Sequence, residues 1–174
     1  FRRVLFRSTQ VKMAGNTVQI RPVKKEDAAQ ICANCYSANT LEQIEAQLDE
    51  NIRGAAEGKL GHLVAEVDAQ VVGTAILRQR EHTLKAHRAE VLGLVVNSNY
   101  QRQGIARRLV EECGNRALAM GIEILEIGCR GGEPAEEIYP RLGFIECGRL
   151  PRGLRESWGE GKTFDSVRFY KPLK

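Results

Sequence analysis

The ten residues Asn99–Arg108 (NYQRQGIARR) stand between an apolar run and a long amphipathic segment. Gly104 and Ala106 place small residues at alternate positions there, and Gln101 and Arg102 add side-chain donors. The first N–H groups of a helix have no intrahelical partner, and they carry a partial positive charge. Small residues at such an end let phosphate oxygens approach the main chain. The segment therefore suits a diphosphate, and the alternative is an ordinary helix start with a solvated basic face.

The composition limits the class of protein that has to position this segment. The chain has 174 residues, of which 43% are hydrophobic and 28% charged, as in ordinary globular domains. No apolar stretch approaches the ~18–20 residues that span a bilayer, and no secretory h-region is visible. We therefore expect no membrane partner.

The first twelve residues differ in character from the rest of the chain. They carry Arg2, Arg3, Arg7 and Lys12 without an acidic residue, and Met13 is a better natural start. We interpret residues 1–12 as a leader or assembly artefact and residues 13–174 as one domain. Without those four charges the formal net charge falls from +4 to about zero. The basic pI of 8.9 is then weak evidence for nucleic-acid binding, and we expect no nucleic-acid partner.

Five cysteines, an odd number, form no small-scaffold disulfide pattern. This usage favours a reducing, cytoplasmic compartment. Cys32 and Cys35 form a C-x-x-C within a predicted helix, without a second such pair. A metal or redox site is one interpretation. Packing of the two thiols in the core is the other, and we prefer it, so no metal is expected.

The periodicity and turn signals predict an α/β (α+β) fold with element order β-α-α-β-β-β-α-β-α-β-β. We expect a mixed, mostly antiparallel central sheet of about seven strands with helices on both faces. The strand before the opening motif and the strand after its helix should form a right-handed parallel β-α-β unit. That context favours the phosphate interpretation of the motif. The expected strands are 17–22, 60–67, 71–80, 89–97, 122–129, 144–150 and 164–173, and the expected helices are 24–38, 41–55, 102–121 and 133–143, with Thr40 as N-cap of the second helix.

Two stretches resemble motifs of one family. "LGLVVNSNYQRQGIARRLV" resembles the acetyl-CoA motif of the GNAT superfamily of N-acetyltransferases, and "EEIYPRLGFIECG" resembles the second motif of that family. The resemblance covers about residues 17–172. It implies a GNAT-like fold, acetyl-CoA as co-substrate and no metal, and it makes a homodimer plausible.

The resemblance also implies residue roles for cofactor binding. Main-chain groups of Leu94, Val95 and Val96 should hydrogen-bond the pantetheine arm. Gly93 marks a bulge in that strand or is merely tolerated there. The pyrophosphate should be held by Arg102, Gln103, Gly104, Ile105, Ala106 and Arg107, with Gln101 beside it.

For the chemistry, the resemblance implies that Tyr139 protonates the departing thiolate; the alternative is a tyrosine packed on the sheet. The Val96 N–H is a candidate oxyanion donor. Many relatives carry a glutamate where this chain has Leu92, so the general base is uncertain. Glu90 shares a strand face with position 92 and could act through water. His82, His87 and Cys129 are weaker candidates, since exposed loop histidines and a buried core thiol explain them better.

The acceptor is suggested by local charge. Leu41–Glu50 contains four acidic residues, Glu45 and Asp49 among them, and no basic one. The late loop adds Trp158 and Glu160. Carboxylates beside an aromatic wall suit a cationic amine such as a polyamine or an aminoglycoside, which includes antibiotic inactivation; the alternative is solvated surface.

The function predicted from these features is N-acetyltransfer from acetyl-CoA to a small-molecule primary amine, by direct attack in a ternary complex. Two alternatives stay open. One is acetylation of a protein or peptide amine, and the other is a non-catalytic acyl-CoA sensor.

Overall fold

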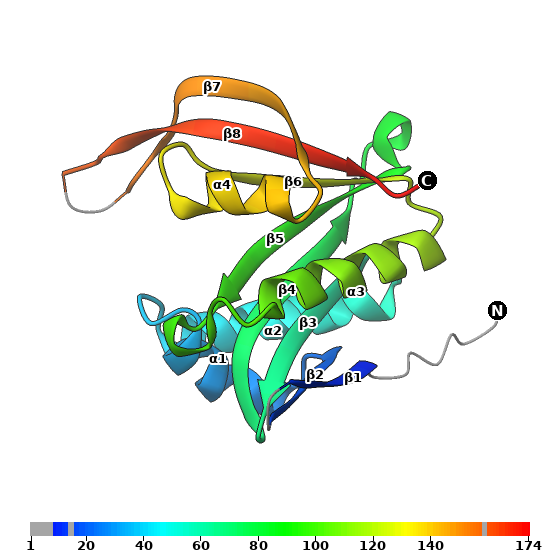
Figure 1. Cartoon of the computed structure of the whole chain (residues 1–174), viewed down its shortest axis with the longest axis vertical. Helices are drawn as coiled ribbons and strands as arrows, with labels where there is room; N and C mark the ends of the chain where they lie inside the picture. Colours follow the sequence, from blue (N-terminus) through cyan, green and yellow to red (C-terminus); the bar gives the residue numbers. More distant parts are fainter. Residues whose placement is uncertain (1–8, 14–15, 158–159) are drawn as a thin grey trace. The chain divides into compact units, whose positions relative to one another are not determined.

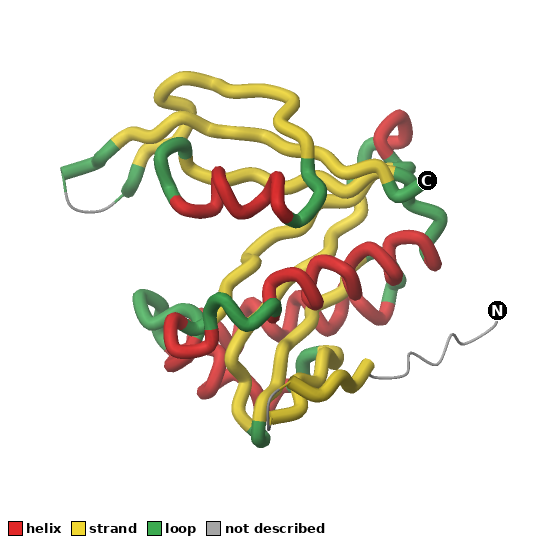
Figure 2. Tube along the Cα trace, viewed as in Figure 1, coloured by secondary structure: helices red, strands yellow, loops and turns green. Residues whose placement is uncertain are grey.

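The computed structural model describes residues 9–13, 16–157 and 160–174. They fall into two compact units, Phe1–Leu77 with Gly93–Cys113 and Arg78–Leu92 with Gly114–Lys174. We call these the first and second unit and describe each by itself (Figures 1 and 2). Within the described residues, no helix combines the length and apolar character needed to cross a bilayer. The single domain expected over residues 13–174 stays a prediction.

The first unit contains the strands β1 to β4 and the end of β5, hydrogen-bonded in that order. β2 and β3 are antiparallel, with Ile20 opposite Ala65. β3 and β4 form the predicted hairpin. Its turn residues Asp68 and Ala69 have φ values of 48° and 63°, as a type I′ turn requires. The bounds are β1 Thr9–Met13, β2 Asn16–Pro22, β3 Leu60–Val67, β4 Gln70–Gln79 and β5 Arg88–Val96.

Strand β1 lies where the sequence analysis expected no element. It pairs antiparallel with β2, with Val11 opposite Val18. No strand is predicted there because residues 1–12 are interpreted as a leader or assembly artefact, although residues 10–13 alternate between polar and apolar side chains. The described residues therefore hold eight strands in place of about seven.

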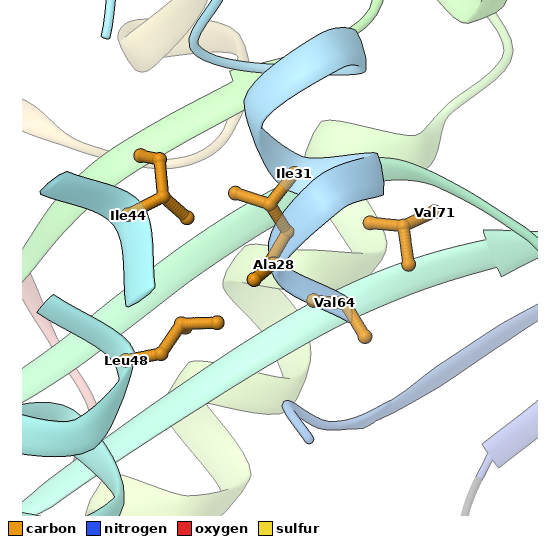
Figure 3. Close-up of a cluster of buried hydrophobic side chains, with 6 residues drawn as sticks. All are labelled: Ala28, Ile31, Ile44, Leu48, Val64 and Val71. Carbon is orange, nitrogen blue, oxygen red and sulfur yellow. The ribbon is translucent and has the colours of Figure 1, made fainter. Parts of the chain in front are cut away.

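Two helices, α1 (Ala28–Asn34) and α2 (Leu41–Ala56), cover one face of β3 in the first unit. Their apolar side chains meet those of the strands (Figure 3). Cys32 and Cys35 pack against this cluster, as the core interpretation expected, and the described residues contain no group of metal ligands. The cluster consists of Ala28, Ile31, Ile44, Leu48, Val64 and Val71.

The ends of these helices follow local signals. Thr40 caps α2 as predicted, because its hydroxyl accepts from Gln43 N at 3.3 Å and Gln43 accepts from Thr40 N at 3.0 Å. The helix predicted over 24–38 is shorter: a 3-10 turn, η1 (Lys25–Asp27), precedes α1, which ends at Asn34. Asp27 is buried and bound to Arg21 at 2.7 Å, which fixes this start.

Helical spacing in the sequence predicts that α2 buries Leu41, Ile44, Leu48 and Ile52, and this prediction is partly wrong. Leu41 is exposed, and Asn51, not Ile52, is buried beside Leu48. Asn51 Nδ2 lies 3.1 Å from His62 Nδ1, and His62 Nε2 lies 2.8 Å from Thr74 Oγ1. Burial lowers the pKa of His62 to about 4, so its ring is neutral and links α2, β3 and β4 by hydrogen bonds.

Helix α3 (Ile105–Ala119) covers the other face of the first unit's strands with its first half. Ile105 and Leu109 lie 3.4 Å from the position of a Cβ on Gly73 of β4. Figure 1 draws α3 in front of β4 and α2 behind it. Neighbouring residues of β3, Leu63 and Val64, are both buried, as two covered faces require. Helices thus lie on both faces, as predicted.

The second unit contains the start of β5, then β6 (Ile124–Arg130), β8 (Thr163–Pro172) and the edge strand β7 (Ile145–Arg155). β5 and β6 are parallel and are joined through α3, which confirms the predicted β-α-β unit. β8 is antiparallel to both β6 and β7. Helix α4 (Pro134–Arg141) begins with a proline in its first turn. Short 3-10 turns, η2 (Thr83–Lys85) and η3 (Ser98–Tyr100), complete the described elements.

Candidate active site

The connection from β5 to α3 is a tight, internally bonded turn in the first unit. Asn97 Oδ1 accepts from Asn99 N at 3.0 Å, and Asn97 O accepts from Tyr100 N at 2.9 Å. Gln101 N then donates to Ser98 O at 3.4 Å. These bonds turn the chain back within a few residues, so that the segment predicted to bind phosphate stands directly at the start of α3.

The turn itself has the backbone shape that an anion site needs. Arg102 and Gly104 both have left-handed conformations, with φ of 63° and 77°. Gln101 to Gly104 are exposed, and a Cβ on Gly104 would meet nothing within 4 Å. The helix ladder begins with Arg108 N donating to Gly104 O at 3.1 Å, so the N–H groups of Ile105 and Ala106 have no intrahelical acceptor.

Left-handed residues next to helical ones aim successive N–H groups toward a common point. The open space above Gly104 leaves room for an oxygen there. The turn therefore has a backbone shape that suits an anion, and binding of the coenzyme A diphosphate there stays a prediction. The left-handed conformation of Arg102 has no sequence signal, since non-glycine residues seldom adopt it. α3 begins at Ile105, three residues later than predicted, because Arg102 interrupts the helix.

The two glutamines of the motif have other partners in this structure. Gln101 Nε2 donates to Val96 O at 3.0 Å, and Gln103 Nε2 approaches Asn99 O at 3.5 Å. The Gln101 amide thus fastens the turn to the end of β5, and the Gln103 amide lies against the turn itself. Their role as side-chain donors to a phosphate stays a prediction.

Gly93, at the point where β5 enters the first unit, is required by its surroundings. Its φ is 54°, and a Cβ at this position would lie 2.4 Å from Tyr36 Oη. The alternative of a glycine merely tolerated in the strand is therefore wrong. Leu94, Val95 and Val96 follow directly and are half-buried. Their expected main-chain bonds to a pantetheine arm stay a prediction.

In the second unit, Tyr139 of α4 is nearly buried, with 8% of its surface exposed. Its ring packs edge-on against Phe169 at 5.6 Å and tilted against Phe144 at 6.1 Å between centroids. Burial, with a smaller contribution from Cys129, raises its pKa to about 12. The phenol is therefore protonated near neutral pH, which is the state that a general acid requires. The structure supports both the packed and the acid interpretation.

Beside Tyr139, a charged contact fixes the start of α4. Glu136 accepts from Gly132 N at 2.7 Å and forms a close ion pair with Arg149 of β7. The backbone hydrogen bond and then Arg149 lower the pKa of Glu136. Burial and then Glu136 raise the pKa of the Cys129 thiol. A protonated thiol is a weak nucleophile, so Cys129 fits poorly as an acyl carrier.

Glu90, predicted as a base acting through water, lies in an ion-pair network of the second unit. Its carboxylate lies 2.8 Å from both Arg80 and Arg168, and its side chain is 14% exposed. Arg80 also binds Glu126 at 2.7 Å. Two guanidinium partners already occupy the oxygens that would accept a proton. The catalytic role of Glu90 stays a prediction.

The predicted acceptor residues are placed only in part. In the first unit Glu45 is exposed on α2, and Asp49 pairs with Lys25 at 2.5 Å. In the second unit Glu160 is exposed in a turn. Trp158 lies outside the described residues. The structure therefore does not gather these four residues, and their role in binding stays a prediction.

The side chains that support β5 were not predicted from the sequence. Tyr36 contacts Gly93, and Asn97 contacts the end of α1 through Asn34. No periodicity or motif marks them, because they act across long sequence separations. The one available signal was Gly93 itself, since a glycine within a strand indicates close approach by another group.

Comparisons with known proteins agree with this geometry. The model of the acetyltransferase (GNAT) family matches residues 26–144. A ribosomal-protein-alanine N-acetyltransferase from Brucella melitensis is 26% identical with a TM-score of 0.74, over 88% of this chain and 98% of that chain. The yncA protein from Salmonella typhimurium, solved with its cofactor acetyl-CoA, is 20% identical with a TM-score of 0.75, over 90% and 94%.

A chimera of spermidine N-acetyltransferase SpeG from Vibrio cholerae and hSSAT is 16% identical with a TM-score of 0.72, over 90% of this chain and 95% of that chain. No curated protein sequence matches significantly. The family match spans the β5–α3 turn and α4, which carry the predicted site. This chain therefore belongs to the GNAT family of acetyltransferases and is an acetyl-CoA-dependent N-acetyltransferase.

Proposed function

We propose that the enzyme acetylates the primary amine of a small cationic molecule by direct attack on the bound thioester. The observation that carries this proposal is the acidic surface of α2. Glu42, Glu45 and Glu50 are exposed there, and the carboxylate of Asp49 pairs with Lys25 of the preceding turn. A surface of one charge sign attracts a polycation over several ångströms. A polyamine or an aminoglycoside has that charge.

Each part of the reaction is assigned to residues with suitable chemistry. Acetyl-CoA supplies the acetyl thioester. The N–H groups at the start of α3 and the small residue Gly104 would hold its diphosphate. The Val96 N–H would donate to the thioester oxygen as negative charge develops there. Tyr139, protonated because of its burial, would give its proton to the departing sulfur.

The amine must lose a proton before it attacks, and Glu90 remains the candidate base through water. Its two carboxylate oxygens are already bound by Arg80 and Arg168, each at 2.8 Å. Proton transfer from the amine directly to solvent at alkaline pH would then limit the rate. We therefore expect turnover to rise with pH as the fraction of neutral amine increases.

A second acceptor class has its own support. The Brucella melitensis structure with 26% identity is a ribosomal-protein-alanine N-acetyltransferase. The α-amino group of a protein is less basic than an alkylamine, at about 7.7–8.0, so it needs less help from a base. An enzyme without a direct carboxylate base suits that acceptor.

An amine panel separates these proposals. Spermidine, an aminoglycoside, a peptide with N-terminal alanine and a neutral amine would each be mixed with acetyl-CoA, and released thiol measured. We expect the polycations to give the highest kcat/KM. A preference for the peptide would favour the second class. Binding of acetyl-CoA without turnover of any amine would favour the sensor alternative.

Charge variants test the acidic surface directly. Glu45→Gln should raise the KM of a polycation severalfold while leaving the KM of a neutral amine unchanged. Glu57→Gln, at the far end of the same helix and also exposed, is the matched control. Equal effects of both variants would contradict a binding role for Glu45.

The proposal also covers the cellular compartment and the oligomeric state of the enzyme. All five cysteines are free thiols, and Cys147 is exposed, which supports a reducing, cytoplasmic compartment. A homodimer stays an expectation from the family resemblance. Inactivation of an aminoglycoside antibiotic would follow only if the panel selects that acceptor.

A further inference from the structure

The short segment from Gly93 to Asn97 is held at both ends, by the last residue of α1 and by Tyr36 just beyond that helix. At one end Tyr36 Oη donates to Gly93 O at 2.9 Å. At the other, Asn97 Nδ2 donates to Asn34 O at 3.1 Å. All four residues lie in the first unit. The residues between the two contacts are Leu94, Val95 and Val96, which are expected to face the pantetheine arm.

The end of α1 next to these contacts is itself fixed to β4. Asn34 Nδ2 donates to Val71 O at 2.8 Å, and Gln30 Oε1 accepts from Val71 N at 2.7 Å. Cys35 and Tyr36 also pack against the buried cluster under α1 and α2. A support that is bonded and packed in this way can hold a neighbouring strand in one position.

The contact at Gly93 explains why the strand has its unusual shape there. Gly93 has a φ of 54°, which turns its backbone away from the course of an extended strand, and a hydrogen bond to its exposed carbonyl holds that shape. The Tyr36 hydroxyl is the donor of that bond. Burial raises the pKa of Tyr36 to about 12, so the hydroxyl keeps its proton at any working pH.

We infer that Tyr36 is a positioning residue, which sets the course of Leu94–Val96 through its hydrogen bond to Gly93 and thereby aligns this strand for the acyl-pantetheine part of acetyl-CoA. The inference rests on the proposed function of that strand. It assigns Tyr36 no contact with the reacting atoms. The diphosphate turn at residues 101–104, which has its own internal bonds, should be independent of Tyr36.

Tyr36→Phe tests this, because it removes the hydroxyl and keeps the ring. Two probes are compared: acetyl-CoA, and adenosine 3′-phosphate 5′-diphosphate, which has the phosphates without the pantetheine arm. We expect the Kd and KM for acetyl-CoA to rise roughly fivefold, the equivalent of one lost hydrogen bond. The Kd for the truncated nucleotide should change by less than about twofold.

Gly93→Ala supplies a second, independent route to the same readout. Its Cβ would lie 2.4 Å from the Tyr36 hydroxyl, so it displaces that hydroxyl and strains the backbone. In the Tyr36→Phe background the nearest remaining ring atom, Cζ, is 3.6 Å away, an ordinary contact. Gly93→Ala should therefore cost less acetyl-CoA affinity in that background than alone, which is a coupling that a double-mutant cycle measures.

Tyr170→Phe in β8, a half-buried tyrosine outside this contact, is the matched control and should change neither Kd. Equal losses of affinity for both probes, unchanged affinity in Tyr36→Phe, or additive effects in the cycle would each overturn the inference. Those results differ from failure of the proposed function, in which the wild-type enzyme itself binds no acetyl-CoA or acetylates no amine.

Discussion

The β5–α3 turn of the first unit and the start of α4 in the second unit are built in different ways. The turn owes its shape to backbone conformations, at Arg102 and Gly104, and to neutral hydrogen bonds from amide side chains. The start of α4 is fixed by the ion pair of Glu136 and Arg149. Further along the same helix, aromatic rings pack around Tyr139. The first presents main-chain donors, and the second presents one phenol.

This difference decides how each region should respond to change. Neutral hydrogen bonds are insensitive to salt, whereas the attraction between exposed charges weakens as the salt concentration rises. An added side chain should weaken binding at a main-chain site. Removal of a single functional group should slow the reaction step that this group performs. Binding of acetyl-CoA and the chemical step should therefore be separable by substitution.

The largest effect is expected for Tyr139→Phe, which removes the phenol and keeps the aromatic packing. If Tyr139 is the general acid, kcat should fall about 100-fold, because proton transfer by a positioned group contributes that much or more. The KM for acetyl-CoA should stay nearly unchanged, since the turn of the first unit is intact. Thiol release at saturating amine and acetyl-CoA measures both constants.

The pH profile sharpens the same test. Because burial raises the pKa of Tyr139 to about 12, the phenol keeps its proton below that pH and loses the proton only above it. Wild-type turnover should therefore not decline on the alkaline side through this group below about pH 11. Tyr170→Phe is the control, and unchanged kinetics in Tyr139→Phe would remove this tyrosine from the mechanism.

The backbone site was predictable from sequence because its signals are local. Gly104 and Ala106 stand at a strand-to-helix junction, and both the junction and the small residues can be recognised within ten residues. The Thr40 cap and the hairpin turn at Asp68 were predictable for the same reason, since each depends on residues a few positions apart.

The supporting contacts were not predictable, because each joins residues far apart in the chain. Tyr36 and Gly93 are 57 positions apart, and Arg168 and Glu90 are 78 positions apart. The burial of Asn51 on α2 was not predictable either, because a buried asparagine is acceptable only when partners such as His62 exist. Those partners come from β3, and nothing in the helix sequence reveals them.

An intermediate effect is expected for Gly104→Ala in the first unit. The methyl group would stand in the open space above the turn, where a phosphate oxygen is expected, so the KM for acetyl-CoA should rise about tenfold with little change in kcat. The left-handed conformation adds a stability cost of about 1–2 kcal/mol. Initial rates against acetyl-CoA concentration and a urea melt measure the two effects.

Gly58→Ala is the matched control for backbone strain. Gly58 has φ of 75°, against 77° for Gly104, and a Cβ there also meets nothing within 4 Å. It should lose the same stability and keep the wild-type KM. Equal KM values in the two variants would mean that the turn does not bind the diphosphate.

The smallest effect is expected for Glu136→Gln in the second unit. The amide oxygen can still accept from Gly132 N, but the charge that holds Arg149 is lost. Because the pair is open to solvent, kcat should fall less than about twofold, and the difference from wild type should vanish at roughly 0.5 M salt, where the pair is already screened.

Glu137→Gln, whose pair with Arg141 at 4.0 Å lies on the surface, is the control and should match wild type at all salt concentrations. A salt-independent loss of tenfold or more would instead show that Glu136 acts directly on the reaction. Helix α4 would then supply two functional side chains, Glu136 and Tyr139, whereas the β5–α3 turn would act through its main chain.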